Sequence, residues 1–424
     1  MSHAHDRVVV VGAGLVGLAV ARSLAQTGRD VVVLDKEATV AAHQSGHNSG
    51  VVHTGIYYAP GSLKATLSRR GVELLKDYCG EHSLTYREIG KVIVARDIGE
   101  LERLADLEQR ARVNGVPEVR RLASAELREI EPHVTGVAAL YSPTTAIVDY
   151  PAVARTLAGE IEAAGGVVRL GEAVTGFDRS GSGVVVGTSR EPIHADRVVL
   201  CAGLQSDTLA RAAGDGPGPA IVPFRGEYYR LVPDRADLVR GLVYPVPDPA
   251  YPFLGVHFTP RVDGHVDIGP NAVLATASEG YRRRDVDLTD LRRTLAWPGS
   301  RRLFRRHWRA GVRELRGSLF TRAYVALATV PTSEAGAASG AYGTVQQVGA
   351  ALGVAVIGTV FFGVVGTSYD VASLRSGLLA ACWVAAGGYA LSAVASLFLP
   401  TRAQVHAHQE AVERELTEAE PVAA

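Results

Sequence analysis

The stretch RVVVVGAGLVGLAVARSLAQTGRDVVVLD, residues 7–35, decides the fold. A β-branched run leads into a glycine-rich turn, an apolar helical stretch follows, and a second β-branched run ends at Asp35. Strand, glycine turn, helix and strand in this order predict a dinucleotide-binding unit. The alternative is a glycine turn in an ordinary βαβ unit, and the motif by itself does not separate FAD from NAD.

Each glycine of this turn has its own physical task. Gly12 makes the tight turn, and Gly14 lets a pyrophosphate approach the backbone. Gly17 lets the helix pack closely on the strand, and the helix N-terminus offers free N–H groups to the phosphates. Asp35 ends the second strand, where its carboxylate can accept hydrogen bonds from ribose hydroxyls.

The pattern of the first 330 residues is that of an α/β protein. We expect strands at 8–11, 31–34, 184–187 and 197–200, and helices at 15–26, 63–82, 98–114 and 151–164. Alternating strands and helices predict a parallel sheet.

Composition excludes several classes of protein. The 424 residues carry 44 basic and 44 acidic side chains, which argues against a nucleic-acid partner bound through a basic surface. Apolar residues make up 47% and charged residues 21%, so the chain can bury a sizeable core. The three cysteines lie far apart, as expected in a reducing compartment, and the short polar N-terminus predicts no signal peptide.

The C-terminal part differs in character. No charged residue occurs at 335–369 or at 376–401, and each run is long enough to cross a bilayer. The sequence therefore predicts two transmembrane helices within 335–401, with both ends on the cytoplasmic side, and a polar tail at 402–424. The alternative is a pair of buried core helices.

Further motifs carry a resemblance to a known family. Residues 43–58, HQSGHNSGVVHTGIYY, hold small and polar side chains that let a flat ring and a pyrophosphate approach the backbone. This stretch resembles the L-2-hydroxyglutarate oxidase/dehydrogenase family, among the FAD-dependent oxidoreductases similar to D-amino acid oxidase. The resemblance spans about residues 5–325 and includes IVDYP at 147–151, CAGLQSD at 201–207, PFRGEYY at 223–229 and FLGVHFTP at 253–260.

The resemblance implies FAD as the cofactor and an α/β (α+β) fold in two parts. Residues 1–90 and 145–210 would form the FAD-binding part, and residues 91–144 and 211–325 the substrate part. An antiparallel sheet at about 210–300 would roof the flavin, with a hairpin at 257–269. A strand over 167–174 would return to the FAD-binding part. The implied cofactor contacts are Ser45, Asn48, Ser49, Val174 near the adenine, and Ala202 and Gly203 near the pyrophosphate.

The implied reaction is oxidation of the C2 alcohol of L-2-hydroxyglutarate to 2-oxoglutarate. A base must receive the hydroxyl proton, and histidine titrates in the right range. His53 is the first candidate and His257 the second; the alternative for His53 is a buried histidine bonded to backbone or flavin. His43 and His47 are interpreted as structural.

The diacid substrate needs cationic or hydroxyl donors. Arg225 offers a bidentate guanidinium, and Tyr58 and Tyr229, with Tyr57, offer phenols. The alternatives are a surface ion pair for Arg225 and packing roles for the tyrosines. The arginine runs at 282–284 and 301–309 are expected to be solvated, and no metal site is predicted.

The family resemblance ends near Val330, and its usual C-terminal section is not found in the sequence. Residues 330–340 and 344–355 instead resemble the end of a major-facilitator drug-efflux transporter. The chain then looks like a fusion whose activity we expect to be impaired. Two other hypotheses stay open: a related amino-acid or sarcosine-type oxidase, and a non-catalytic chimera. The electron acceptor is oxygen or a quinone. The expected location is the cytoplasmic face of the inner or plasma membrane, or the cytoplasm if the helices do not insert.

Overall fold

The computed structural model describes residues 6–216, 218–249, 255–319, 375–376 and 378–383. The chain divides into two compact units, Met1–Pro331 and Thr332–Ala424. Apart from residues 375–376 and 378–383, which are helical, the predicted transmembrane region and the predicted tail lie outside the described residues. Among the helices that are described, none is both long and apolar enough to cross a membrane.

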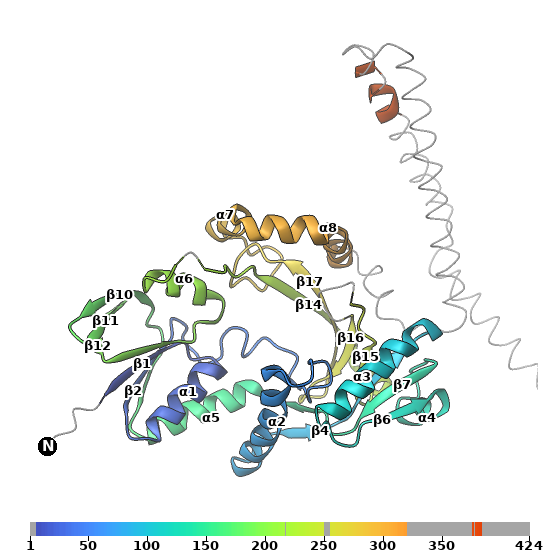
Figure 1. The fold of residues 1–424 in the computed structure, drawn as a ribbon, viewed down its shortest axis with the longest axis horizontal. Helices are drawn as coiled ribbons and strands as arrows, with labels where there is room; N and C mark the ends of the chain where they lie inside the picture. Colours follow the sequence, from blue (N-terminus) through green and yellow to red (C-terminus); the bar gives the residue numbers. More distant parts are fainter. Residues whose placement is uncertain (1–5, 217, 250–254, 320–374, 377, 384–424) are drawn as a thin grey trace, which may run out of the picture. The chain divides into compact units, whose positions relative to one another are not determined.

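A four-stranded parallel sheet is the centre of the predicted nucleotide-binding part (Figure 1). Its order is β13 (Arg197–Leu200), β1 (Arg7–Val11), β2 (Asp30–Leu34) and β9 (Val167–Arg169). All three pairings are parallel, and Val9 lies between Val198 and Val32 in the ladder. The predicted parallel sheet is confirmed; the strand expected at 167–174 ends at Arg169.

The two faces of this sheet are buried by different elements. Val8 and Val10 pack in one core with α1 (Leu15–Ala25) and α5 (Tyr150–Ala163), which lie side by side on that face (Figure 1). Val9 and Val11 pack on the other side against a small antiparallel sheet, β10 (Val174–Ser180), β11 (Gly183–Thr188) and β12 (Ile193–Ala195). Burial on both faces explains the unbroken valine run, since neither face can be polar.

A seven-stranded mixed sheet forms the second part. Its order is β14 (Phe224–Arg230), β17 (Val266–Leu274), β16 (His257–Pro260), β15 (Leu242–Pro245), β5 (Lys91–Ala95), β7 (Ala138–Ser142) and β6 (Arg120–Ala123). Every pairing is antiparallel except β15 with β5. The hairpin of β16 and β17 is confirmed.

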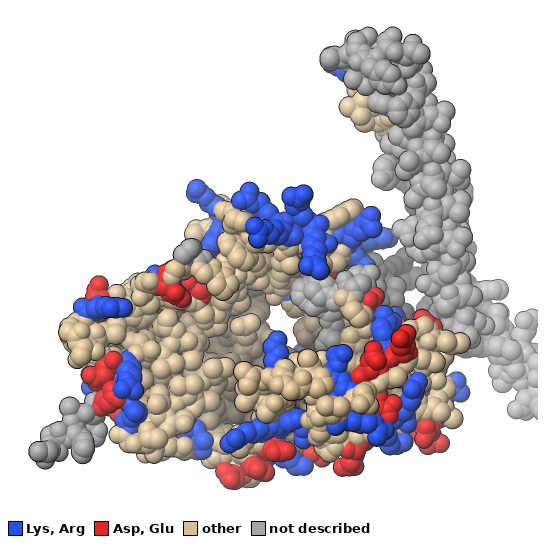
Figure 2. Space-filling view, in the orientation of Figure 1, with Lys and Arg blue, Asp and Glu red and all other residues tan. Residues whose placement is uncertain are grey.

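The expectation of an antiparallel sheet throughout 210–300 is wrong in two respects. One of the pairings is parallel, and it recruits a strand from residues 91–95. The end of the range is helical: α7 (Leu288–Ala296) begins at Asp287, whose carboxylate accepts the N–H groups of Thr289 and Asp290. The helix α8 (Pro298–Leu319) follows, and its arginines project into solvent (Figure 2).

A third sheet joins the two parts. It consists of β3 (Val51–Val52), β8 (Ala146–Val148) and β4 (Tyr86–Glu88). The remaining elements are α2 (Leu63–Glu81), η1 (Ile98–Glu100), α3 (Leu101–Val113), α4 (Ser124–Ile130), η2 (Gly203–Gln205), α6 (Ser206–Ala212) and η3 (Pro233–Leu238). The four helices expected from the sequence are confirmed to within one residue at each end, with η1 completing the third.

Candidate active site

The glycine turn after β1 leaves no room for side chains. Gly12 has φ +112°, and a Cβ there would lie 2.4 Å from the carbonyl oxygen of Cys201. A Cβ at Gly17 would lie 1.9 Å from the carbonyl oxygen of Gly12. Contacts below 3.0 Å with backbone atoms force the chain to move, so both positions require glycine.

The N-terminus of α1 is arranged to receive an anion. Gly14 occupies the cap position without a side-chain hydrogen bond, and the first turn contains no acidic residue. The N–H of Leu15 donates to Ser45 Oγ at 3.0 Å, and a Cβ at Gly14 would meet the same oxygen at 3.0 Å. A helix end with a positive dipole and a bare glycine cap fits a diphosphate, so these residues fit FAD.

Asp35 fixes the turn at the end of β2. Its Oδ2 accepts the N–H of Ala13 at 2.7 Å, and its Oδ1 accepts the N–H of Glu37 at 2.9 Å. Each carboxylate oxygen can accept a second hydrogen bond, so the predicted contact with a ribose remains compatible with this geometry.

The segment after β2 folds over the same turn. Asn48 holds it together: its Nδ2 donates to the carbonyl of Ser45 at 2.7 Å, and its Oδ1 accepts the N–H of Gly50 at 2.8 Å. Arg261 Nη1, from the loop after β16, donates to the carbonyl of Asn48 at 2.7 Å. The hydroxyl-bearing Ser49 is partly buried in this segment.

The other predicted cofactor residues lie in two places. Ala202 and Gly203 follow β13, and a Cβ at Gly203 would lie 3.4 Å from Gln44 Oε1, so this turn adjoins the 43–48 segment. Val174 begins β10 and packs in the core between the parallel sheet and the small antiparallel sheet.

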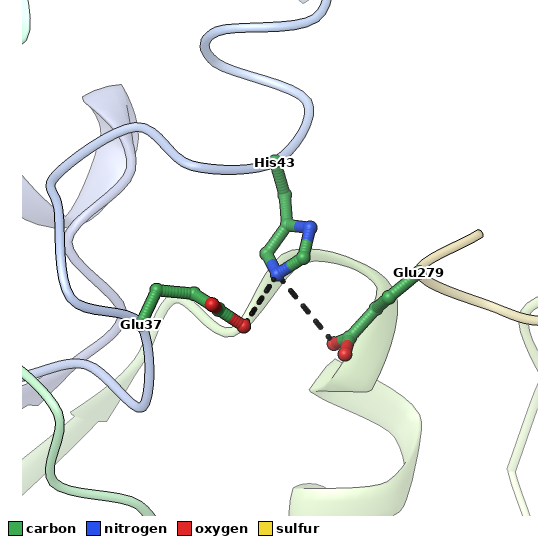
Figure 3. A group of neighbouring side chains, drawn as sticks. All are labelled: Glu37, His43 and Glu279. Carbon is green, nitrogen blue, oxygen red and sulfur yellow. Dashed lines mark hydrogen bonds and ion pairs between the residues drawn. The ribbon is translucent and has the colours of Figure 1, made fainter. Parts of the chain in front are cut away.

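An ion-pair group lies on the segment that folds over the glycine turn at 12–17, and we refer to this turn as the nucleotide loop (Figure 3). His43 Nε2 lies 2.9 Å from a Glu37 oxygen and 4.0 Å from a Glu279 oxygen, and the three residues are close enough to hold a metal ion. Lys36 Nζ donates to both carboxylates, and Gln205 donates to Glu279 at 3.1 Å. Lys36 already balances the negative charge of these carboxylates. We therefore interpret the group as a clamp that joins the segment after β2 to the segment after β17.

His43 and His47, the two histidines interpreted as structural, both interact with Tyr281. Tyr281 stacks on His47 with ring centroids 3.9 Å apart, and its hydroxyl lies 3.3 Å from His43 Nδ1. His43 is also part of the clamp.

The two catalytic candidates, His53 and His257, meet in a buried cluster with Tyr57, Lys91 and Tyr244. His53 and Tyr57 lie on the segment after β3, Lys91 begins β5, Tyr244 lies on β15 and His257 begins β16. Leu242 pairs with Lys91 and Val243 with Phe258, so three neighbouring strands bring these side chains together. We refer to these five residues as the buried cluster.

Burial controls the charge of the buried cluster. Burial, together with the charge of the nearby Lys91, lowers the pKa of His53 to about 3 and that of His257 to about 4. Burial also lowers the pKa of Lys91 to about 7. Both imidazoles are therefore neutral at neutral pH, and Lys91 titrates there.

His257 has a defined tautomer. Its Nδ1 lies 2.9 Å from the carbonyl oxygen of Gly255, which can only accept, so Nδ1 carries the proton and Nε2 keeps its lone pair. The ring stacks on Tyr244 with centroids 3.8 Å apart. A neutral imidazole held in this way can accept a proton at Nε2.

Two of the three predicted substrate residues have other partners. Arg225 donates to Glu227 at 2.8 Å and to the carbonyl of Arg282 at 3.0 Å. Tyr229 bonds to Arg283, which also pairs with Glu227. Tyr58 is partly buried, and its carbonyl accepts a hydrogen bond from Asn114. Arg225 therefore forms the ion pair that was its alternative role.

No sequence pattern indicated a role for three residues that lie at or beside the buried cluster. Lys91 and Tyr244 lie outside every motif quoted from the sequence. Tyr228, one residue from the predicted Tyr229, interacts electrostatically with Tyr244. An alternating strand presents successive residues to opposite faces, so an error of one position selects the wrong face.

A glycine-turn dinucleotide site beside a mixed sheet with a buried base defines a two-part, dinucleotide-dependent oxidoreductase. The family model described as "FAD dependent oxidoreductase" matches residues 7–326. The chain belongs to this family, among the L-2-hydroxyglutarate dehydrogenases.

Relatives of that description are more than 40% identical to the chain over the aligned residues. The mitochondrial L-2-hydroxyglutarate dehydrogenase of Nematostella vectensis is 44% identical over 326 residues, covering 73% of this chain and 72% of the relative. The L-2-hydroxyglutarate dehydrogenase of Escherichia coli K12 is 41% identical over 322 residues, covering 75% and 76%.

Solved structures show the same fold. FAD-bound L-α-glycerophosphate oxidase from Mycoplasma pneumoniae is 26% identical, with a TM-score of 0.60, covering 66% of this chain and 75% of that one. Glycine oxidase from Geobacillus kaustophilus, 22% identical with a TM-score of 0.56, covers 69% and 78%. The family and the FAD-bound neighbour identify FAD as the cofactor.

Proposed function

We propose that the chain oxidises L-2-hydroxyglutarate to 2-oxoglutarate. The observation that carries this proposal is a pair of buried, neutral histidines in a chain of this family. Oxidising an alcohol to a ketone removes a hydride from carbon and a proton from oxygen, so the protein must supply a base. FAD, when bound, supplies the hydride acceptor.

His257 is the favoured proton acceptor. Its Nδ1–H donates to the carbonyl oxygen of Gly255, so the lone pair of Nε2 points in a known direction and can accept a proton. The order of the two candidates is thus reversed from the sequence-based expectation, in which His53 came first. A substrate carboxylate beside the imidazole raises its pKa and makes it a stronger base.

Anaerobic reduction tests the proposal. L-2-hydroxyglutarate added to the purified holoprotein should bleach the visible absorbance of the flavin and yield one 2-oxoglutarate per flavin. The D-enantiomer and L-amino acids are the controls. Bleaching by an amino acid alone would support the amino-acid oxidase hypothesis, and bleaching by none of them would support the non-catalytic chimera.

Membrane attachment through residues 335–401 remains a proposal from the uncharged runs of the sequence. It implies a site on the cytoplasmic face of a membrane, where a quinone is a plausible electron acceptor beside oxygen. Partition of the full chain into the membrane fraction, compared with a chain ending at residue 330, tests the attachment. The proposed fusion is tested separately by reading genomic DNA across codons 320–345.

A further inference from the structure

Lys91 lacks a counter-charge among the residues that the structure describes. The residue is only 2% exposed, and its Nζ faces two aromatic rings, 3.9 Å from the centre of Tyr244 and 4.5 Å from that of Tyr57. Among the described residues, no carboxylate and no hydrogen-bond acceptor pairs with this Nζ.

A buried ammonium without a counter-ion is unfavourable. Aromatic faces attract a cation, but they replace only part of its hydration. Replacing a buried charged group by an apolar side chain of similar volume is often neutral or stabilising, so stability alone does not account for a lysine at this position.

The other groups that face Lys91 suit an anion. Tyr244 comes from β15, His257 from β16, and His53 and Tyr57 from the segment after β3. The Tyr57 hydroxyl is buried and has no hydrogen-bond partner among the described residues. Both histidines are uncharged at neutral pH, so Lys91 is the one member of the buried cluster that can carry a positive charge there.

The position predicted to bind the substrate anion is occupied. Arg225 is paired with Glu227 in a contact where both side chains are 11% exposed. Lys91, by contrast, has its charge available.

We infer that Lys91 is the binding site for a carboxylate of the substrate, with the Tyr57 hydroxyl as a second donor. This inference rests on the proposed function. It makes the buried cluster selective for anionic hydroxy acids, because only an anion supplies the charge that Lys91 lacks.

Calorimetry of the holoenzyme with 2-oxoglutarate tests the inference. At about pH 8 much of Lys91 is deprotonated, so pairing with a carboxylate should take up a proton. Titrations in two buffers of different ionisation enthalpy measure that uptake. K91M should abolish it and weaken binding about 100-fold or more, as expected when one partner of a buried charge pair is removed.

Two variants make the result specific. K64M, on the exposed start of α2, should bind and take up protons like the wild type. K91R, which keeps a charge, should bind more tightly than K91M. K91M should also unfold at a temperature at or above that of the wild type near pH 7, since it removes a buried unpaired charge.

The outcomes separate this inference from the proposed function. If L-2-hydroxyglutarate reduces the wild-type flavin but K91M binds 2-oxoglutarate as tightly, the carboxylate site lies elsewhere and the function stands. If K91M and K91Q both lose flavin or unfold at lower temperature, Lys91 is structural and the inference is wrong. Absence of reduction in the wild type contradicts the function itself.

Discussion

The nucleotide loop and the buried cluster are built by different means. The loop consists mainly of backbone: Gly12, Gly14 and Gly17 leave space, and α1 offers its N–H groups. The buried cluster consists of side chains that arrive from four separate segments. A site made of backbone tolerates no added atom, whereas a site made of side chains can lose a functional group and still fold.

The largest effect is expected at Gly17. G17A puts a Cβ 1.9 Å from a carbonyl oxygen and should destabilise the protein by more than about 4 kcal/mol, with loss of bound flavin. Flavin content after purification measures this. G159A is the matched control: Gly159 lies in α5 with nothing within 4 Å, so alanine should be neutral or stabilising. Normal flavin content in G17A would contradict the claim that the nucleotide loop tolerates no added atom.

The next effect belongs to the buried cluster. H257N keeps a donor for the carbonyl of Gly255 but loses the lone pair at Nε2, so kcat should fall about 100-fold or more while the flavin stays bound. Rapid-reaction reduction by L-2-hydroxyglutarate measures the rate. The exposed His133 provides the control variant H133Q. If flavin reduction becomes slow in H53N but not in H257N, His53 is the base.

Acid should lower the free energy of unfolding through the buried cluster rather than through the nucleotide loop. In the unfolded chain a histidine gains a proton near its ordinary pKa of 6.5, whereas folded His257 stays neutral down to about pH 4. The unfolded state then binds more protons, so stability falls as the pH drops below 6.5, by about 2 kcal/mol at pH 5 for this residue. Denaturant unfolding at pH 7 and pH 5 should show a smaller loss in H257N. An equal loss would mean that His257 is protonated when folded.

The smallest effect is expected at the clamp, which joins the segment after β2 to the segment after β17. E279Q weakens contacts with Lys36 and His43 that are partly exposed to solvent, so stability should change by about 0.5 kcal/mol. Thermal unfolding measures it, with D215N, on an exposed turn, as the control. A loss as large as that of G17A would show that the clamp holds the loop in place.

The sequence was informative where the structure is local. Residues 7–35 carry strand, turn, helix and acid in one continuous segment, and the structure has each of them where expected. The packing of α1 on β1 involves only residues that are close in the sequence. The valine runs and the spacing of the glycines are therefore enough to predict it.

The buried cluster could be predicted only in part. The histidines were found because they lie in recognisable motifs, but Lys91 and Tyr244 gain their meaning from a parallel pairing of β5 with β15 that no local pattern announces. The prediction that the sheet extends to residue 300 was wrong for a related reason. The arginine-rich residues 298–319 form a helix that covers β17, and a covering helix and an exposed strand are both rich in charge.

The parallel pair of β5 and β15 also sets the order in which the molecule can be made. As the chain leaves the ribosome, β5 can pair with β7 once residues 138–142 have emerged, but its other edge stays unpaired until residues 242–245 emerge. Until then Lys91 stands at an open sheet edge in contact with water, where its ammonium is hydrated. The burial of its side chain, and the loss of water that this entails, must therefore come late in synthesis.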